Sequence, residues 1–349
     1  MPPNADPGPE RPRAGSPQAG PGAEVGPRRA APPARTRVER FADHDAFATE
    51  ASGSGFEMTL TGPESGTWRS AAGILERSSV VFGVEGGANV GHAAIPPHMV
   101  VFRVARAGPP PISAGRRLDR SSVAVHGPGA HQFEAVLGPS AWATFAVDRR
   151  LVEETGVELG VGGDVVLPGD RRVVTVDRAR MAEVRRALAR ARRTIRHAPA
   201  TFERPASTTP LQRDLVRAFV GAVGTAGPRG RATATERRRL DVLVASMAYL
   251  GATKTHAVTL PELCGVVEAS PRTLTRVFQD ALCLSPARYL RLRRFGQVRA
   301  HLRRGTPRPH TVTSAALRFG FTELGRFSGE YRRLFGESPS DTLRGREGA

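Results

Sequence analysis

The chain has 349 residues, of which 40% are hydrophobic, so it is long enough for two globular domains. Its formal net charge is +18, and residues 229–349 hold 22 Arg or Lys against 10 Asp or Glu. This excess favours a polyanionic partner, while the lack of a long apolar run or an apolar leader excludes a membrane-spanning helix and a secretion signal. We therefore expect a cytoplasmic protein that binds double-stranded DNA rather than a membrane.

The first part of the chain, residues 1–36, is rich in Pro, Gly, Ala and Arg and has no Phe, Tyr, Trp, Ile or Leu before residue 35. A segment of this composition cannot bury enough apolar surface to offset its conformational entropy. We predict a disordered tail.

Residues 37–225 differ in composition, with short runs rich in Val, Phe and Thr separated by Gly and Pro. This spacing predicts an antiparallel β barrel or sandwich. The interior of such a barrel is the default pocket for a small ligand. The predicted strands cover residues 56–61, 79–84, 99–105, 122–126, 131–137 and 141–147.

The candidate metal ligands in this β-rich stretch are His92, His98, His126, His131 and Glu134. A cupin-type metal site would need a close His cluster with a carboxylate, but the paired His-x-His spacing is absent. We interpret the histidines as surface or structural residues and predict no metal and no cofactor.

Two helices follow the strands. Apolar residues repeat at helical spacing over residues 178–196, and again over residues 209–223 after Thr209-Pro210. Their apolar stripes suit either a dimer contact or packing against the barrel, and the sequence leaves both open. Glycines indicate that residues 226–235 form a linker. Thr235, its last residue, is expected to cap the first helix of a domain over residues 236–349.

Within that domain, Ser270-Pro271 predicts a helix start, with a hydroxyl at the N-cap and proline at the first helical position. The preceding helix opens at Leu260 and a short turn covers residues 267–269, which is the helix-turn-helix geometry. An apolar stripe on the second helix leaves its opposite face to solvent. That face carries guanidinium, hydroxyl and amide groups, which read base edges and bind phosphates, on Arg272, Thr275, Arg276 and Gln279.

The unit occurs twice, at an offset of about 52 residues before the turn and 53 after it. We call the second helix of each unit its reading helix. The second reading helix is predicted over residues 322–334, and a continuous helix over residues 289–304 would join the copies rigidly. The predicted core of the two copies consists of Leu263, Cys264, Leu274, Phe278, Ala316, Phe321, Phe327 and Tyr331. Cys283 is also expected on a buried face, so both cysteines are interpreted as small apolar residues.

The stretch over residues 235–344 resembles the DNA-binding domain of AraC/XylS-type transcriptional regulators. The resemblance depends on Ser270-Pro271-Arg272-Thr273-Leu274, Arg294-Phe295, Phe319-Gly320-Phe321-Thr322 and Phe335-Gly336-Glu337-Ser338-Pro339. It implies an α+β protein with an N-terminal cupin-like sensing domain and a C-terminal all-α tandem helix-turn-helix domain. It further implies an activator that contacts RNA polymerase, a small-molecule effector or partner, and a homodimer formed by the helices after the barrel.

Two departures from the family pattern change these expectations. Glu268 stands in the first turn where the family has glycine, so we expect strain or another conformation there. In the second reading helix, Gly325, Ser328 and Gly329 replace the longer polar side chains of the first. We therefore expect the first copy to discriminate bases, through Arg272, Thr273, Thr275, Arg276 and Gln279, and the second mainly to bind phosphates, through Arg326, Ser328, Arg332 and Arg333.

Two rival functions remain open from sequence alone. A cupin-like enzyme tethered to DNA would need catalytic residues, but the sequence has no glycine-rich phosphate loop, zinc spacing or nucleophile elbow. A non-specific architectural DNA binder fits the charge but leaves the β-rich domain unexplained. We predict a regulator without enzymatic activity.

Overall fold

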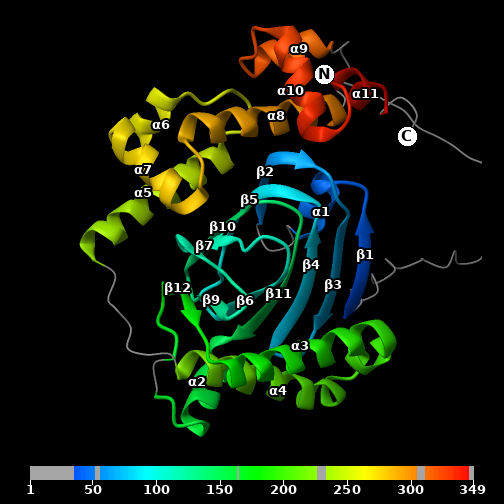
Figure 1. The fold of residues 1–349 in the computed structure, drawn as a ribbon, viewed down its shortest axis with the longest axis vertical. Helices are drawn as coiled ribbons and strands as arrows, with labels where there is room; N and C mark the ends of the chain where they lie inside the picture. The colour runs from blue at the N-terminus through cyan, green and yellow to red at the C-terminus, as the bar shows by residue number, and fades with distance from the viewer. Residues whose placement is uncertain (1–34, 52–55, 163–164, 226–232, 305–310, 346–349) are drawn as a thin grey trace, which may run out of the picture. The chain divides into compact units, whose positions relative to one another are not determined.

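The computed structural model describes residues 35–51, 56–162, 165–225, 233–304 and 311–345. A β-rich region, residues 36–225, is followed by a helical region, residues 234–345 (Figure 1). Contacts between Cα atoms join the two regions into one compact unit. Most of the predicted tail and residues 226–232 of the predicted linker lie outside the described residues.

The strands form two sheets in which every pairing is antiparallel. The larger sheet has the spatial order β1 (Thr36–Phe41), β3 (Trp68–Ile74), β4 (Ser78–Glu85), β11 (Ser140–Asp148), β6 (Met99–Ala107), β9 (Ser122–His126) and β12 (Arg171–Thr175). The smaller sheet has the order β2 (Glu57–Glu64), β5 (Gly87–Ala94), β10 (His131–Val136), β7 (Ile112–Ser113) and β8 (Arg116–Arg117). The predicted antiparallel fold is confirmed, as two sheets of which neither closes on itself.

The central strands of the larger sheet are buried on both faces. In β6, Val100, Phe102 and Val104 lie in the core that the sheet shares with helices. Arg103, between two of them in sequence, is also buried and lies on the opposite face. Continuous burial explains why these strands read as nearly unbroken apolar runs rather than as an alternating pattern.

Helices cover one face of the larger sheet. They are α2 (Arg149–Glu158), α3 (Arg178–His197), the short 3-10 helix η2 (Pro199–Glu203) and α4 (Pro205–Gly224), while α1 (His44–Ala51) lies between β1 and β2 in the chain. α3 and α4 run side by side (Figure 1), and their apolar stripes enter the core of the sheet. The stripes considered for a dimer contact are therefore used for packing against the sheet.

The predicted start of α4 at Thr209 was wrong. The helix begins four residues earlier, where Pro205 occupies the first helical position, and Pro210 lies inside it. Proline at the first helical position needs no N–H partner, and the carbonyl of Pro205 accepts a hydrogen bond from the Thr208 hydroxyl at 2.8 Å. Both Pro205 and Pro210 are possible first residues of a helix, and the helix begins at Pro205.

The helical region contains α5 (Ala234–Ala252), α6 (Leu260–Val266), α7 (Pro271–Leu282), α8 (Pro286–Arg304), α9 (Val312–Arg318), α10 (Leu324–Phe335) and α11 (Pro339–Arg344). The N-cap of α5 is Thr233, not Thr235, because its hydroxyl and the Glu236 carboxylate form a capping box. Likewise α10 follows Glu323 rather than Thr322, which shortens the predicted second reading helix by two residues at its start.

Cys283 was predicted to be buried, and this was wrong. It is exposed and ends α7 in a left-handed conformation with φ of 56°. Cys264 is partly buried and packs against the core of the first copy. Among the described residues, no helix combines the length and apolarity needed to cross a membrane.

Glu268 in the first turn adopts φ of 50°, and Gly320 adopts φ of 78° at the equivalent place in the second copy. A residue with a Cβ atom is strained in this left-handed conformation, by about 1–2 kcal/mol. We predict that Glu268→Gly raises the free energy of unfolding by about 0.5–1 kcal/mol, after the entropic cost of glycine is subtracted. Urea denaturation measures the change.

The matched control is Glu268→Ala, which removes the carboxylate but keeps the Cβ atom. It should give no comparable gain. Equal stability of the Ala and Gly variants would show that backbone strain at this turn is absent.

Candidate nucleic-acid interface

The first reading helix, α7, is fixed by its cap and its apolar face. The Ser270 hydroxyl accepts a hydrogen bond from the Thr273 amide at 3.2 Å, and Pro271 occupies the first helical position. Leu274, Val277 and Phe278 are buried in the core below the helix. Because the buried residues repeat every three or four positions, the opposite face is turned to solvent.

The exposed face of α7 holds all the residues predicted there, namely Arg272, Thr273, Thr275, Arg276 and Gln279. The Thr275 hydroxyl donates to the carbonyl of Pro271 at 2.8 Å, and the Thr273 hydroxyl lies 2.9 Å from that of Ser270. Arg276 lies 3.8 Å from the Asp280 carboxylate with most of its side chain exposed, an arrangement that contributes little energy. The guanidinium groups of this face are therefore accessible to an outside partner.

The second reading helix, α10, presents a different surface. Its buried residues are Phe327, Tyr331, Leu334 and Phe335. The Ser328 hydroxyl donates to the carbonyl of Leu324 at 3.0 Å and is partly buried, so it is a poorer candidate for a base contact than the sequence indicated.

The arginines of α10 also differ in their surroundings. Arg326 lies 2.9 Å from the Glu330 carboxylate and 3.7 Å from that of Glu323, so much of its charge is compensated within the helix. Arg332 and Arg333 are exposed and have no ion pair within the described part of the chain. These two arginines are the better candidates for phosphate contacts.

The predicted core residues of the two copies are inside the domain. Seven of them are buried, and Cys264 is partly buried, in the set Leu263, Cys264, Leu274, Phe278, Ala316, Phe321, Phe327 and Tyr331. The two copies have separate cores, and each includes residues of the β-rich region. Ile112 and Phe133 pack into the first, and Trp68 into the second.

The long helix α8 connects the two copies through its arginines. Arg291 forms an ion pair of 2.9 Å with Glu330 of α10 and lies over the ring of Phe295. Arg293 donates to the backbone carbonyls of Leu250 and Thr253 at the end of α5. Because these contacts reach both copies from one helix, α8 holds the copies in a fixed relation.

A buried charge cluster, centred on Arg299 of α8, joins the helical region to the β-rich region. We call it the Arg299 cluster. Its guanidinium nitrogens lie 3.2 Å from carboxylate oxygens of Asp43, Asp45 and Glu337, and only 3% of the side chain is exposed. Arg303, one turn later, lies 3.0 Å from Asp45. No local sequence pattern indicates this cluster, because Asp43 and Asp45 lie about 250 residues from Arg299 in the chain.

The charges of the Arg299 cluster shift the pKa of its acids. Burial alone would raise the pKa of Asp43, but the hydrogen bond from Arg303 and the charges of Arg299 and Arg303 lower it to about 2. Burial would likewise lower the pKa of His44, but hydrogen bonds to Asp45 and Glu64 raise it above its ordinary value. The cluster is therefore held by ionised carboxylates.

A second buried charge group lies between the two sheets. The guanidinium of Arg103 lies 2.5 Å from the Glu134 carboxylate and 4.0 Å from the centre of the Trp142 ring, whose indole N–H donates to Glu85 at 2.7 Å. Burial raises the pKa of Glu134 to about 7, against the opposing effect of Arg103.

The histidines considered for a metal site lie in different surroundings. No group of three metal-ligating side chains occurs among the residues that the structure describes. His92 and His131 stack with their nitrogens 3.2 Å apart, His98 is exposed, and His126 is fully buried. Burial lowers the pKa of His126 to about 3, so its imidazole is neutral.

A cavity of about 1480 Å³ lies between the β-rich region and helices α5 and α7 of the helical region. From the β-rich region it is lined by His126, Phe133 and Arg171, and from the reading helix by Val277 and Asp280. Burial lowers the pKa of Arg171 to about 10. The cavity thus brings His126 and Arg171 of one region next to α7 of the other, a connection that the sequence did not indicate.

Residues 263–345 match the helix-turn-helix domain family. Over 96 residues the chain is 40% identical to the probable thc operon regulatory protein of Rhodococcus erythropolis, covering 28% of this chain and 29% of that protein. Over 87 residues it is 40% identical to XylDLEGF operon transcriptional activator 2 of Pseudomonas putida, covering 25% and 55%. The chain thus spans less than two thirds of the length of either relative.

Among solved structures, one is described as a probable AraC family transcriptional regulator from Rhodopseudomonas palustris. It is 32% identical and is matched over 30% of this chain and 97% of its own length, with a TM-score of 0.28. The sequence relatives align over about a quarter of this chain.

We predict that Asp43→Asn lowers the free energy of unfolding by about 2 kcal/mol at pH 7. The folded pKa of Asp43, about 2, lies below its ordinary value of 3.8, so its carboxylate stabilises the fold above that value. This stabilisation is lost as the pH falls from about 5 toward 2. Urea denaturation at several pH values measures the difference between the two proteins.

Asp214→Asn serves as the control, because Asp214 pairs with Arg190 at the surface and should contribute less than about 1 kcal/mol. If the deficit of Asp43→Asn were the same at pH 3 and pH 7, lost packing rather than charge would explain it.

Proposed function

Residues 263–345 belong to the helix-turn-helix family of AraC/XylS-type regulators, and from this premise we propose that the chain is a sequence-specific DNA-binding transcriptional regulator. The observation that supports this most is the pair of exposed helix faces, on α7 and α10, carried by the single helix α8. One polypeptide would then place two reading helices in successive major grooves, about 34 Å apart.

We assign unequal roles to the two reading helices. Arg272, Arg276 and Gln279 of α7 are long, exposed and able to reach base edges, where guanidinium groups bind guanine and amides bind adenine. Arg332 and Arg333 of α10 would contact phosphates and hold the protein in register. Arg326 already pairs with Glu330 at 2.9 Å and would have to exchange this partner for a phosphate, so its contribution would be smaller.

The proposed action is activation of transcription through contact with RNA polymerase. Support comes from the relatives in Pseudomonas putida, which are named operon transcriptional activators. We assign no enzymatic activity to the chain, since its recognisable family is that of regulators. If the protein forms a homodimer, its interface must use a surface other than the apolar stripes of α3 and α4, which are covered by the sheet.

We place the small-molecule effector in the cavity between the two sheets and α7. A ligand there would contact His126 and Arg171 on one side and Val277 on the other. Because Val277 also belongs to the core beneath the reading face, binding could shift α7 without any direct contact with DNA. Effector binding and DNA binding would then be thermodynamically coupled.

Binding-site selection from random duplexes at two salt concentrations tests the proposal. The full chain is used, because Ile112 and Phe133 contribute to the core of the first copy. We expect a motif in two parts about one helical turn apart, with stronger base preferences in one part. Salt-sensitive binding without any enriched motif would contradict a sequence-specific reader and support a non-specific DNA binder.

Variants test the different roles proposed for α7 and α10. Arg276→Ala should cost about 1–3 kcal/mol on the selected site and relax the preference at one position. Arg332→Ala should weaken binding to all duplexes by a similar factor and reduce the slope of log affinity against log salt by about 1. Fluorescence anisotropy on selected and scrambled duplexes measures both effects.

Arg186→Ala is a matched control, since Arg186 is an exposed arginine on α3 in the β-rich region. It should leave both the affinity and the preference almost unchanged. An equal loss of base preference from Arg276→Ala and Arg332→Ala would overturn the unequal roles.

A further inference from the structure

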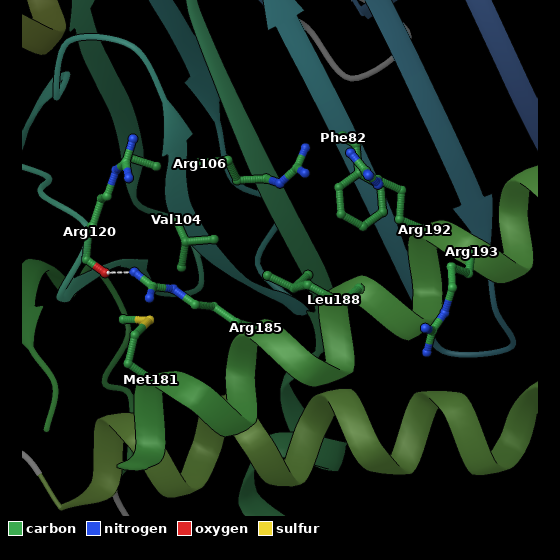
Figure 2. A pocket seen from close by; sticks show the side chains of 11 residues that line it. Phe82, Val104, Arg106, Arg120, Met181, Arg185, Leu188, Arg192 and Arg193 are labelled. Atoms are coloured by element: carbon green, nitrogen blue, oxygen red, sulfur yellow. Dashed lines mark hydrogen bonds between the residues drawn. The ribbon is translucent and has the colours of Figure 1, made fainter. Parts of the chain in front are cut away.

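A second cavity, of about 420 Å³, lies between the larger sheet and helix α3, away from both reading helices. Strands β4 and β6 supply one side of it and α3 the other (Figure 2). Its volume falls in the range of sites for small ligands.

The inner wall of this cavity is apolar. It is formed by side chains that also belong to the core between the sheet and α3, namely Phe82, Val104, Met181 and Leu188. Each of the four is at most 5% exposed, so the wall is part of the packed core and would favour an apolar group placed against it.

The rim of the same cavity is strongly cationic. Five arginines line it, namely Arg106, Arg120, Arg185, Arg192 and Arg193. None of the five forms an ion pair with any residue that the structure describes, whereas Arg180 and Arg190 of the same helix pair with Glu183 and Asp214. The cavity therefore gathers guanidinium groups that have no acidic partner among the described residues.

Two of these guanidinium groups are held in defined positions. Arg106 of β6 lies 5.4 Å from the centre of the Phe82 ring, at the edge of the apolar wall. Arg185 donates a hydrogen bond of 2.5 Å to the backbone carbonyl of Arg120, the contact dashed in Figure 2. A guanidinium fixed in this way loses little side-chain entropy when it binds an anion.

The cationic rim is electrostatically unfavourable without an anion. Burial lowers the pKa of Arg106, and the nearby charges of Arg192 and Arg196 lower it further. Like charges gathered over a half-buried apolar surface repel one another more than they would in water. A bound negative group would remove this repulsion and gain charge-assisted hydrogen bonds.

We propose that this cavity binds a small organic anion that has an apolar body, with its carboxylate or similar group between Arg106 and Arg192 and its apolar part against Phe82 and Leu188. An inorganic anion would leave the apolar wall uncovered, and a neutral apolar molecule would leave the guanidinium groups unpaired. The site differs from the effector cavity beside α7 and does not depend on DNA binding.

Isothermal titration calorimetry on the full chain tests the proposal with three probes: sodium octanoate, octan-1-ol and sodium phosphate. We expect saturable binding of octanoate, and binding of the other two at least about tenfold weaker. Octanoate titrations should show binding weakened about tenfold in Arg106→Gln and in Arg192→Gln. Ala189→Glu, which places a carboxylate on the exposed wall of the cavity, should abolish binding without disturbing a buried residue.

Two controls separate this site from other sources of anion binding. Arg186→Gln removes an exposed charge from α3 outside the cavity and should leave octanoate binding unchanged. Arg171→Gln alters the effector cavity and should also leave it unchanged. Equal binding of phosphate or octanol, no saturable octanoate binding, or loss in Arg171→Gln with retention in Ala189→Glu would each overturn the proposal.

Discussion

The buried guanidinium of Arg299 is the interaction on which the placement of the helical region depends. A charge with 3% of its side chain exposed is strongly unfavourable unless carboxylates surround it, and here they come from both regions of the chain. Asp43 and Asp45 belong to the β-rich region and Glu337 to the end of the second copy. If the β-rich region moved away, the buried charge of Arg299 would lose Asp43 and Asp45. This electrostatic penalty holds the two regions together in addition to their apolar contacts.

Helix α8 makes two different sets of contacts, one near its start and one near its end. Near its start, Arg291 pairs with Glu330 of α10, and Arg293 donates to backbone carbonyls at the end of α5, the helix that packs against α7. Near its end, Arg299 and Arg303 fix the same helix to the β-rich region. Because α8 is continuous between these points, one helix connects the Arg299 cluster to both copies.

Local signals in the sequence were enough to predict the helix-turn-helix units, since capping hydroxyls, Pro at the first helical position and apolar spacing act within a few residues. The same signals failed where two of them competed, as at Pro205 and Pro210 or at Thr233 and Thr235. Contacts distant in sequence were beyond prediction. The Arg299 cluster joins residues far apart in the chain, and the arginine-rich cavity depends on which side chains of α3 lack an acidic neighbour. Strands such as β5, rich in Gly and Ala, also gave no apolar pattern to recognise.

The contrast between the two reading helices is not a consequence of packing. At Gly325 and Gly329, a Cβ atom would meet nothing outside its own helix within 4 Å, so the fold would accept a side chain at either place. Glycine inside a helix costs about 1 kcal/mol relative to alanine, and neither residue has a positive φ that would require it. The two glycines therefore reduce the stability of α10, and they leave its outer face without side chains at these two positions. A surface of this kind suits the role proposed for α10, in which its flanking arginines contact a phosphate backbone and no side chain discriminates between bases.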